Sequence, residues 1–423
     1  MMIPMNKELQ KQARSSIIGV IAFGLLYLIY TNFIFTNQTN ILLSLVYYCI
    51  LGLVIVLLGI SFNFINRNRN NAINYTILVN VIVLVVQWLV SQINTNFSVF
   101  SRNIMLSFLN GLAFSMVLFL MVSGFYLIFG LADVINFAHG ALFMLGGFVG
   151  LESYLYWEDF FLKSNLFKTD EFLYSILCFV LAIILTSIIM GAIGGIIEIS
   201  TIRRLYKKPL NQILLTVGIS FIIIQIANVI WGQNQYKIPN QTKTKYFFMT
   251  GNIKEINFFG FTLFDFGSIS FESYSVVIIL LGMSLAVLMY LVFKKTKIGL
   301  IVQAAIEDSE MTELLGINVK LILSLVFITG TILAGIAGFL LVPSIHGGAY
   351  SGLATTYLLY AFVIVVVGGA HYGKLEGTFY GSLIIGFSYK FTEIFFTDYT
   401  SVIVFLIMVI VLVFKPTGLT GQQ

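Results

Sequence analysis

Three polar residues in one Gly-rich stretch, Asp133, Asn136 and His139, are the side chains of this sequence that could most readily do chemistry. They interrupt an apolar run between Gly130 and Gly150, and polar groups at membrane depth are costly unless they have a function or a partner. Asn136 and His139 are three residues apart and would share one face of a helix. They either line a passage for a solute, or they hydrogen-bond the free backbone of a broken helix and fix a tight turn.

Metal and nucleotide chemistry have little support in the sequence. The three histidines are His139, His346 and His371, and their spacing is not that of a metal site. The GxxxxGK[ST] pattern of a phosphate-binding loop does not occur, so the chain has no ATP site of that kind. The GxSxG and HExxH motifs are also missing from the sequence. We therefore expect no enzymatic activity, no metal and no cofactor bound by this chain.

Carboxylates could carry protons across a membrane, and three of them stand close to apolar runs. Glu152, Glu198 and Glu393 all lie near the ends of such runs rather than at their centres. A proton-coupled carrier would need a carboxylate at mid-membrane. Their positions therefore argue against that mechanism and favour placement at the membrane interface.

The composition of the chain predicts a membrane protein. Hydrophobic residues make up 59% and charged residues 10% of the 423 residues, whereas soluble domains carry roughly 25% charged residues. We predict an all-α, polytopic transmembrane helical bundle of about 10–12 spans, with broken or re-entrant helices. The candidate spans are residues 16–35, 41–65, 76–93, 104–132, 138–157, 173–198, 211–231, 273–293, 320–342, 355–370, 377–396 and 400–415.

The distribution of Lys and Arg predicts the orientation. Most of the 23 basic residues lie on one side of the membrane if the N-terminus is cytoplasmic. Both termini and the loop 294–319 then face the cytoplasm, whereas loops 232–272 and 343–350 face outward. The basic cluster Arg203, Arg204, Lys207 and Lys208 is a topology determinant first and a contact for lipid headgroups second. Such loops explain the net charge of +5 without a nucleic-acid partner.

A change in residue composition divides the chain into two parts. The first is an N-terminal extension, residues 1–102, with about three transmembrane helices, and the second is a core, residues 103–418. Glycine is frequent inside the apolar runs of the core, as expected where helices pack closely. Two Gly-rich segments interrupt these runs, Gly130–Gly150 and Val367–Gly386. Breaks of this kind, one in each half of a chain, are the best sequence indication of a transport site.

The segment Gly299–Asn318 is too polar to lie in a membrane, yet its pattern is that of a folded element. Ser309 is placed to cap a short helix, with Glu310 and Glu313 in the first turn. Gly316 is placed to end that helix. The Leu-Leu pair that follows Glu313 gives it an apolar side. We expect a small docking helix that contacts a motor protein.

Three stretches of the chain together resemble the permease subunits of ABC importers for branched-chain amino acids, with the urea permeases as close relatives. Ile135–Val149, INFAHGALFMLGGFV, is similar to the family signature INFAHGxxxMLGAY. The loop from Gly299 is similar to GxxxRAxAxDxxxAxLLGI, with Gln303 where the family usually has Arg. LAGIAGFLL from Leu333 and the segment Val367–Gly386 are similar to LAGLAG…VLGGxGSxxGAxxGGLLLG, with about two extra residues between Gly369 and Gly377, including His371.

This resemblance implies a permease subunit that forms the translocation pathway for branched-chain or other small amino acids in the bacterial cytoplasmic membrane. The implied partners are cytosolic ABC ATPase subunits that use ATP, a second permease subunit or a copy of this chain, and an extracytoplasmic solute-binding protein. The expected pathway residues are Asn136, Phe137, His139, Gly140, Gly146, Gly147, Gly368 and Gly369. The expected ATPase-coupling residues are Gln303, Ala304, Ala305, Glu307, Asp308, Leu315 and Gly316.

Other functions stay open at this point. A permease for urea or short amides is the alternative within the same family. An ion-coupled secondary carrier or channel without an ATPase is the alternative from another class. A membrane receptor or scaffold that transports nothing would be favoured if the first three spans were a sensor. Composition and spacing alone do not choose ABC import among these functions.

Overall fold

The computed structural model describes residues 97–131, 136–164, 171–205, 208–237, 252–253, 255–258, 261–265, 271–343, 348–369 and 375–420. Residues 256–265 belong to a different compact unit from the other described residues. Helix α4 begins at Phe97, six residues before the predicted start of the core. The predicted spans 16–35, 41–65 and 76–93 of the N-terminal extension lie outside the described residues.

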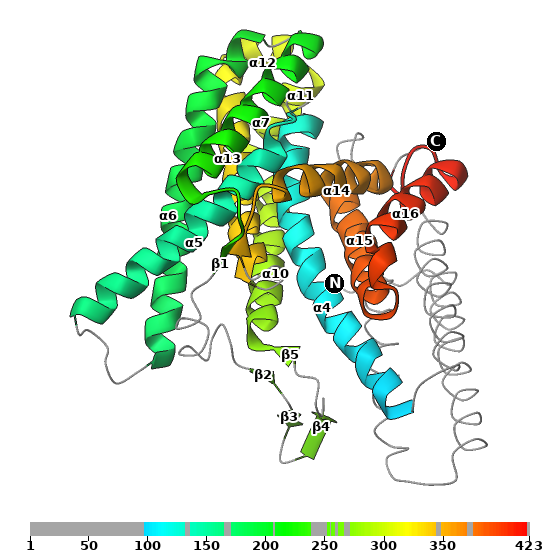
Figure 1. Cartoon of the computed structure of the whole chain (residues 1–423). Helices are drawn as coiled ribbons and strands as arrows, with labels where there is room; N and C mark the ends of the chain where they lie inside the picture. The colour runs from blue at the N-terminus through cyan, green and yellow to red at the C-terminus, as the bar shows by residue number, and fades with distance from the viewer. Residues whose placement is uncertain are drawn as a thin grey trace, which may run out of the picture. The chain divides into compact units, whose positions relative to one another are not determined.

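Long helices make up nearly all of the described fold (Figure 1). They are α4 (Phe97–Tyr126), α5 (His139–Ser164), α6 (Glu171–Ser200), α7 (Pro209–Trp231), α10 (Ser273–Lys295), α13 (Val319–Leu341), α14 (Leu353–Gly368), α15 (Leu375–Phe395) and α16 (Thr400–Phe414). Each predicted span from 104–132 onward coincides with one of these helices, which confirms the all-α class. Six of the described helices are long and apolar enough to cross a membrane.

The strands of the described residues are short and paired. Strand β1 (Tyr236–Lys237) pairs antiparallel with β6 (Gly348–Ala349), and β2 (Asn252–Ile253) pairs antiparallel with β5 (Phe271–Glu272). Strands β3 (Glu255–Phe258) and β4 (Phe261–Asp265) form a third pair. The first pair joins two loops that the charge distribution places on the same, outward side.

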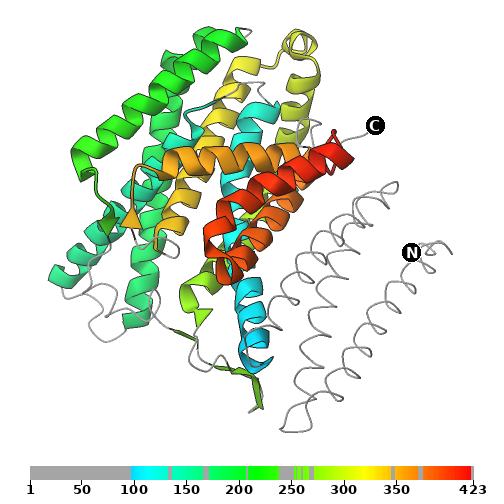
Figure 2. The ribbon, with the colours of Figure 1, turned by 45° about the vertical axis from the view of Figure 1, so that its right-hand side comes forward.

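The core lies where α4, α5 and α13 pack together. Side chains of α4 between residues 113 and 126 and of α13 between residues 333 and 341 are almost all buried. Helix α14 lies across α4 and α13 rather than alongside them (Figure 1, Figure 2). This arrangement suits the short apolar run 355–370, which is too short for an ordinary span. By contrast α7, α10 and α16 bury little of their surface, as expected for helices that face lipid.

Glycines allow α13 to approach its neighbours backbone to backbone. A Cβ atom added to Gly146 of α5 would lie 2.2 Å from the Cα of Gly335, and one added to Gly338 would lie 2.0 Å from the carbonyl oxygen of Phe143. A Cβ added to Gly124 of α4 would similarly meet the backbone of α13. These contacts confirm that the glycines of the core mark close helix packing, the arrangement that small residues permit in membranes.

A matched pair of glycine variants tests this packing. Gly146→Ala forces a methyl group against the backbone of α13, and such overpacking costs about 1–3 kcal/mol. Gly218→Ala in α7 places its methyl group in open space, where replacing a helical glycine gains about 0.5–1 kcal/mol. Thermal unfolding of the purified chain in detergent should therefore show a lower midpoint for the first variant and an unchanged or higher one for the second. Equal midpoints would contradict the packing.

Candidate functional site

The first Gly-rich segment separates α4 from α5. The chain leaves α4 through a π-helical turn, η1 (Leu127–Leu131), and re-enters a helix at His139. Asp133 lies outside the described residues. Asn136 is fully buried, its Oδ1 accepts a hydrogen bond from the backbone N–H of Ala138 at 3.0 Å, and its carbonyl accepts one from His139 at 3.2 Å. Asn136 thus hydrogen-bonds the broken backbone, as one of the two interpretations of the sequence requires.

His139 is fully buried and ties this break to α4. Its Nε2 lies 3.0 Å from the carbonyl oxygen of Met121. Because a carbonyl can only accept, Nε2 carries the proton and Nδ1 presents a lone pair. Within the described residues, Nδ1 of His139 and Nδ2 of Asn136 have no hydrogen-bond partner. One buried acceptor and one buried donor therefore remain here beyond those that the backbone uses.

The neighbours of the break come from two further helices. The backbone N–H of Phe137 donates to Oγ1 of Thr216 on α7 at 3.1 Å. The centroid of the Phe137 ring lies 5.4 Å from that of the Phe362 ring on α14. A Cβ on Gly140 would lie 2.1 Å from the carbonyl oxygen of Ala354. On the next turns of α5, Gly146 and Gly147 face α13. The structure thus brings the first six predicted pathway residues onto one segment held by α4, α7, α13 and α14.

Gly368 and Gly369 have different partners. Gly369 ends α14 in a left-handed conformation, φ +71°, and its N–H donates to the carbonyl of Val365 at 3.0 Å. A Cβ on Gly368 would lie 2.3 Å from the carbonyl oxygen of Gly377 on α15. Oγ1 of Thr420 donates to the carbonyl of Gly368 at 2.7 Å. This break is therefore closed by α15 and the C-terminal segment, and residues 370–374, with His371, lie outside the described residues.

The polar loop 294–319 folds into two helices, α11 (Lys297–Glu307) and α12 (Ser309–Leu314), which Asp308 separates. The prediction that Ser309 caps the short helix was wrong. Asp308 has an extended backbone, φ −150°, and its carboxylate accepts a hydrogen bond from the N–H of Met311 at 2.9 Å. Ser309 is already the first helical residue, so only Glu310 and not Glu313 lies in the first turn.

The end of α12 agrees with the prediction. Gly316 has φ +84°, its N–H donates to the carbonyl of Glu313 at 3.0 Å, and the N–H of Ile317 donates to that of Thr312 at 3.3 Å. These two bonds form a Schellman motif. Oδ1 of Asn318 then accepts from the N–H of Leu321 at 3.1 Å and caps α13. The loop is therefore held at fixed geometry up to the first turn of α13.

This loop exposes several large apolar side chains among its charged residues. Leu314 is 82% exposed, Leu315 is 74% exposed, and Met311 and Leu300 are also exposed. Of the predicted coupling residues, Gln303, Ala304, Asp308, Leu315 and Gly316 are exposed and Ala305 is buried. The side chain of Glu307 is outside the described part. An exposed apolar patch away from the spanning helices is typical of a surface that binds a partner.

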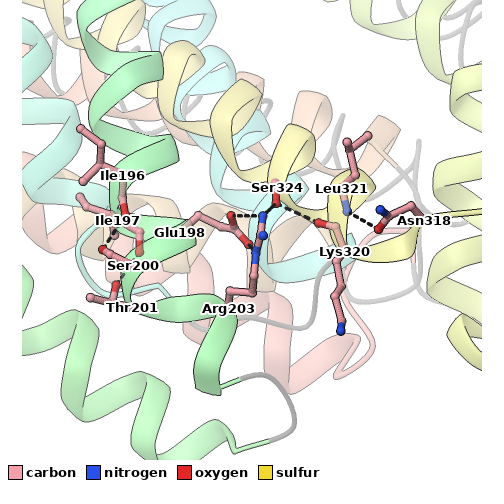
Figure 3. A network of polar contacts seen from close by, with 10 residues as sticks. All are labelled: Ile196, Ile197, Glu198, Ser200, Thr201, Arg203, Asn318, Lys320, Leu321 and Ser324. Atoms are coloured by element: carbon pink, nitrogen blue, oxygen red, sulfur yellow. Dashed lines mark hydrogen bonds and ion pairs between the residues drawn. The ribbon is translucent and has the colours of Figure 1, made fainter.

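Sequence reasoning missed a charged network beside this loop (Figure 3). Nε and Nη2 of Arg203, in η2 (Ile202–Leu205), donate to the two carboxylate oxygens of Glu198 at 3.2 and 3.1 Å. Nη2 also donates to Oγ of Ser324 on α13 at 2.5 Å. Glu198 is fully buried within the protein, in the last turn of α6, and Arg203 is a structural partner as well as a basic loop residue. The network joins the end of α6 to the second turn of α13.

A second polar contact lies in the loops predicted to face outward. Tyr236 of β1 donates to the carboxylate of Glu152 on α5 at 2.7 Å, and Nε1 of Trp231 lies 3.4 Å from the same oxygen. Partial burial and the hydrogen bond to Glu152 raise the pKa of Tyr236 to about 12. The phenol therefore stays protonated and remains a donor at physiological pH. Together with the β1–β6 pair, this contact orders the two loops predicted to face outward.

The model of the family described as branched-chain amino acid transport system, permease component, matches residues 107–412. The high-affinity branched-chain amino acid transport system permease protein BraD of Pseudomonas aeruginosa is 28% identical over 326 residues, which cover 74% of this chain and 94% of BraD.

Two further relatives carry the name LivH. The high-affinity branched-chain amino acid transport system permease protein LivH of Escherichia coli is 25% identical over 323 residues, 74% of this chain and 94% of the relative. The probable branched-chain amino acid transport permease protein LivH of Methanocaldococcus jannaschii is 28% identical over 318 residues, 73% and 90% of the two chains. No solved structure matches this chain.

The buried ion pair in Figure 3 predicts an asymmetric response to mutation. Arg203→Met leaves the fully buried carboxylate of Glu198 without its cation, which costs about 3–5 kcal/mol of unfolding free energy. Adding Glu198→Gln to that variant should recover part of the loss, because the unpaired charge is gone. Arg204→Met, at the exposed neighbouring position, should change stability by no more than about 0.5 kcal/mol. Thermal unfolding in detergent compares all three, and equal effects of the two arginine variants would refute the pairing.

Proposed function

Because this chain belongs to the family of branched-chain amino acid transport permease components, we propose that it forms the translocation pathway of an ABC importer for branched-chain or other small amino acids, driven by separate ATPase subunits. The observation that carries this proposal is the loop between α10 and α13. It is folded and capped at both ends, and it exposes Met311, Leu314 and Leu315 among charged side chains. Nothing in a lone permease needs such a surface, whereas a motor subunit that pushes on the membrane helices does.

The covalent continuity of the loop with α13 supports a mechanical role. Helix α12 passes through the Schellman motif and the Asn318 cap directly into α13. Helix α13 in turn touches α4 and α5 at glycine contacts that leave no slack between the backbones. A displacement of α12 by an ATPase would therefore reach the break at Asn136 and His139 through packed backbone. Alternating access then follows from ATP binding and hydrolysis in the partner.

The remaining partners follow from the same proposal. A second permease subunit or a copy of this chain completes the passage, and a solute-binding protein delivers substrate to the outward side, where β1 and β6 join two loops. The chain lies in the bacterial cytoplasmic membrane with both termini cytoplasmic, and residues 1–102 form an additional three-span extension. Lipid covers the exposed apolar faces of α7 and α16.

The ion-coupled carrier remains the alternative class. It would need a membrane carboxylate that is free to gain and lose a proton. Within the described residues, Glu198 and Glu393 are each paired with a cation. That pairing favours the ATP-driven mechanism over proton coupling. A permease for urea or short amides shares the scaffold and differs from the main proposal in substrate alone.

A double variant of the exposed leucines tests the docking surface. Leu314→Asp with Leu315→Asp should release the ABC ATPase that co-purifies with the wild-type chain, because apolar anchors at an interface contribute about 2 kcal/mol or more each. Thermal unfolding of the isolated chain should not change, since both side chains are exposed. Tyr399→Asp, at an exposed position in η5 (Thr397–Tyr399), serves as the control that keeps the ATPase.

Quantitative pull-down in mild detergent gives the result. Retention of the ATPase by the double variant would reject the docking role of the loop. Recovery of the wild-type chain without any ATPase, together with transport in ATP-free vesicles driven by an ion gradient, would reject ABC import and support the carrier.

A further inference from the structure

The second Gly-rich break, where α14 ends and α15 begins, has no connection to the docking loop (residues 294–319) in the function proposed so far. Helix α13 leads from that loop to the first break, at Asn136 and His139. An ion pair supplies a route to the second break. Nζ of Lys294, in the last turn of α10, contacts Oε1 of Glu376, in the first turn of α15. The two residues are 82 positions apart in the chain, so the pair joins two separate elements.

Lys294 lies at the edge of the docking loop, where the backbone is tightly folded. A single residue, Thr296, separates α10 from α11. Oγ1 of Thr296 donates to the carbonyl of Val292 at 2.6 Å and accepts from the N–H of Gly299 at 3.4 Å. A Cβ atom added to Gly299 would lie 2.2 Å from the carbonyl oxygen of Phe293. Because no space is left between these backbones, a displacement of α11 moves the last turn of α10 with it.

Glu376 lies next to the closest backbone contact of the second break. A Cβ atom added to the following residue, Gly377, would lie 2.5 Å from the carbonyl oxygen of Gly368 on α14. The same carbonyl accepts hydrogen bonds from the N–H and the Oγ1 of Thr420, at 3.1 and 2.7 Å. A displacement of Glu376 therefore reaches the end of α14 and the C-terminal segment directly.

The pair contributes more to the relative position of the two helices than to folding. The side chain of Glu376 is 15% exposed, whereas that of Lys294 is 44% exposed. Ion pairs with this access to water add little to stability. The Tyr290 ring, whose centroid lies 5.1 Å from Nζ of Lys294, holds the ammonium group on the α10 side. The carboxylate of Glu376 is the less exposed partner, and it loses its cation if the two helices separate.

We propose that Lys294 and Glu376 are positioning residues that transmit movement of the docking loop to the second Gly-rich break. The inference rests on the proposed function and adds a second mechanical connection to it. An ATPase that displaces the loop then acts on both breaks at once, through α13 on the first and through this pair on the second. Without the pair, the push on α11 still reaches α13, but α15 and the end of α14 no longer follow.

Transport by the complete system tests the proposal. The full-length chain, its ATPase, the second permease subunit and the solute-binding protein are reconstituted in lipid vesicles, and ATP hydrolysis and uptake of labelled leucine are measured together. Lys294→Met and Glu376→Gln should each lower the leucine taken up per ATP hydrolysed (the coupling ratio) about fivefold, the lower end of the coupling found between linked sites. Co-purification of the ATPase and the thermal unfolding midpoint should not change, since the pair is partly exposed.

Further variants separate the pair from its two side chains. Lys294→Arg keeps the charge and should keep the coupling ratio. Exchange of the two charges, Lys294→Glu with Glu376→Lys, should restore part of the ratio, because it restores the link with its polarity reversed. Lys295→Met removes an exposed charge at the neighbouring position and should leave the ratio unchanged.

Three results would overturn the inference. The first is a wild-type coupling ratio in both single variants. The second is a lower unfolding midpoint with a parallel loss of ATP hydrolysis and uptake, which would make the pair merely structural. The third is loss of the ATPase from the variants, which would make the pair part of the docking surface. ATP-driven leucine uptake with an unchanged ratio rejects the inference and leaves the importer standing, whereas uptake by the wild-type chain without an ATPase rejects both.

Discussion

A polar or charged group inside a bilayer must find its partner within the protein, because lipid offers none. This constraint explains three places in the structure that otherwise have little in common. Asn136 and His139 each use one polar atom of the side chain to hydrogen-bond the backbone around the break between α4 and α5. Each carboxylate oxygen of Glu198 accepts a hydrogen bond from Arg203. Lys390 and Glu393 hold each other between aromatic rings. In each place, local contacts satisfy the polar groups. Each therefore marks a point where the helices must keep their relative positions.

Helix α13 connects these points. Its first turns bind the Arg203 network, its middle meets α4 and α5 at glycines, and its N-terminus continues from the docking loop. A helix packed this closely moves as a body or not at all, since its neighbours have no space to absorb a shift. The exposed leucines of α12 are therefore directly connected to α13, a helix that is otherwise largely buried. Helix α5 carries polar and small residues. The same close packing allows it to lie among apolar helices.

Much of this structure could be predicted from sequence. Apolar runs located the nine long helices described from α4 to α16, and Gly316 predicted the end of α12, because these features depend on local pattern. The cap of α12 was misassigned by one residue, since Ser309 and Asp308 are both good caps and only the backbone angle of Asp308 decides between them. The network of Arg203 with Ser324 joins residues far apart in the chain, and no spacing rule connects them.

The C-terminal segment is part of the interior of the fold. Leu419 and Thr420 donate backbone hydrogen bonds to the carbonyls of Val367 and Gly368, where α14 ends. Gly418, at φ +72°, passes so close to Gly369 that a side chain there would collide with its backbone. Residues 418–420 therefore close the C-terminal end of α14, because the N–H groups of the last two satisfy carbonyls that the helix itself leaves free. A truncation for expression should therefore keep the chain intact through Thr420, because removing Leu419 and Thr420 would leave the carbonyls of Val367 and Gly368 without these donors.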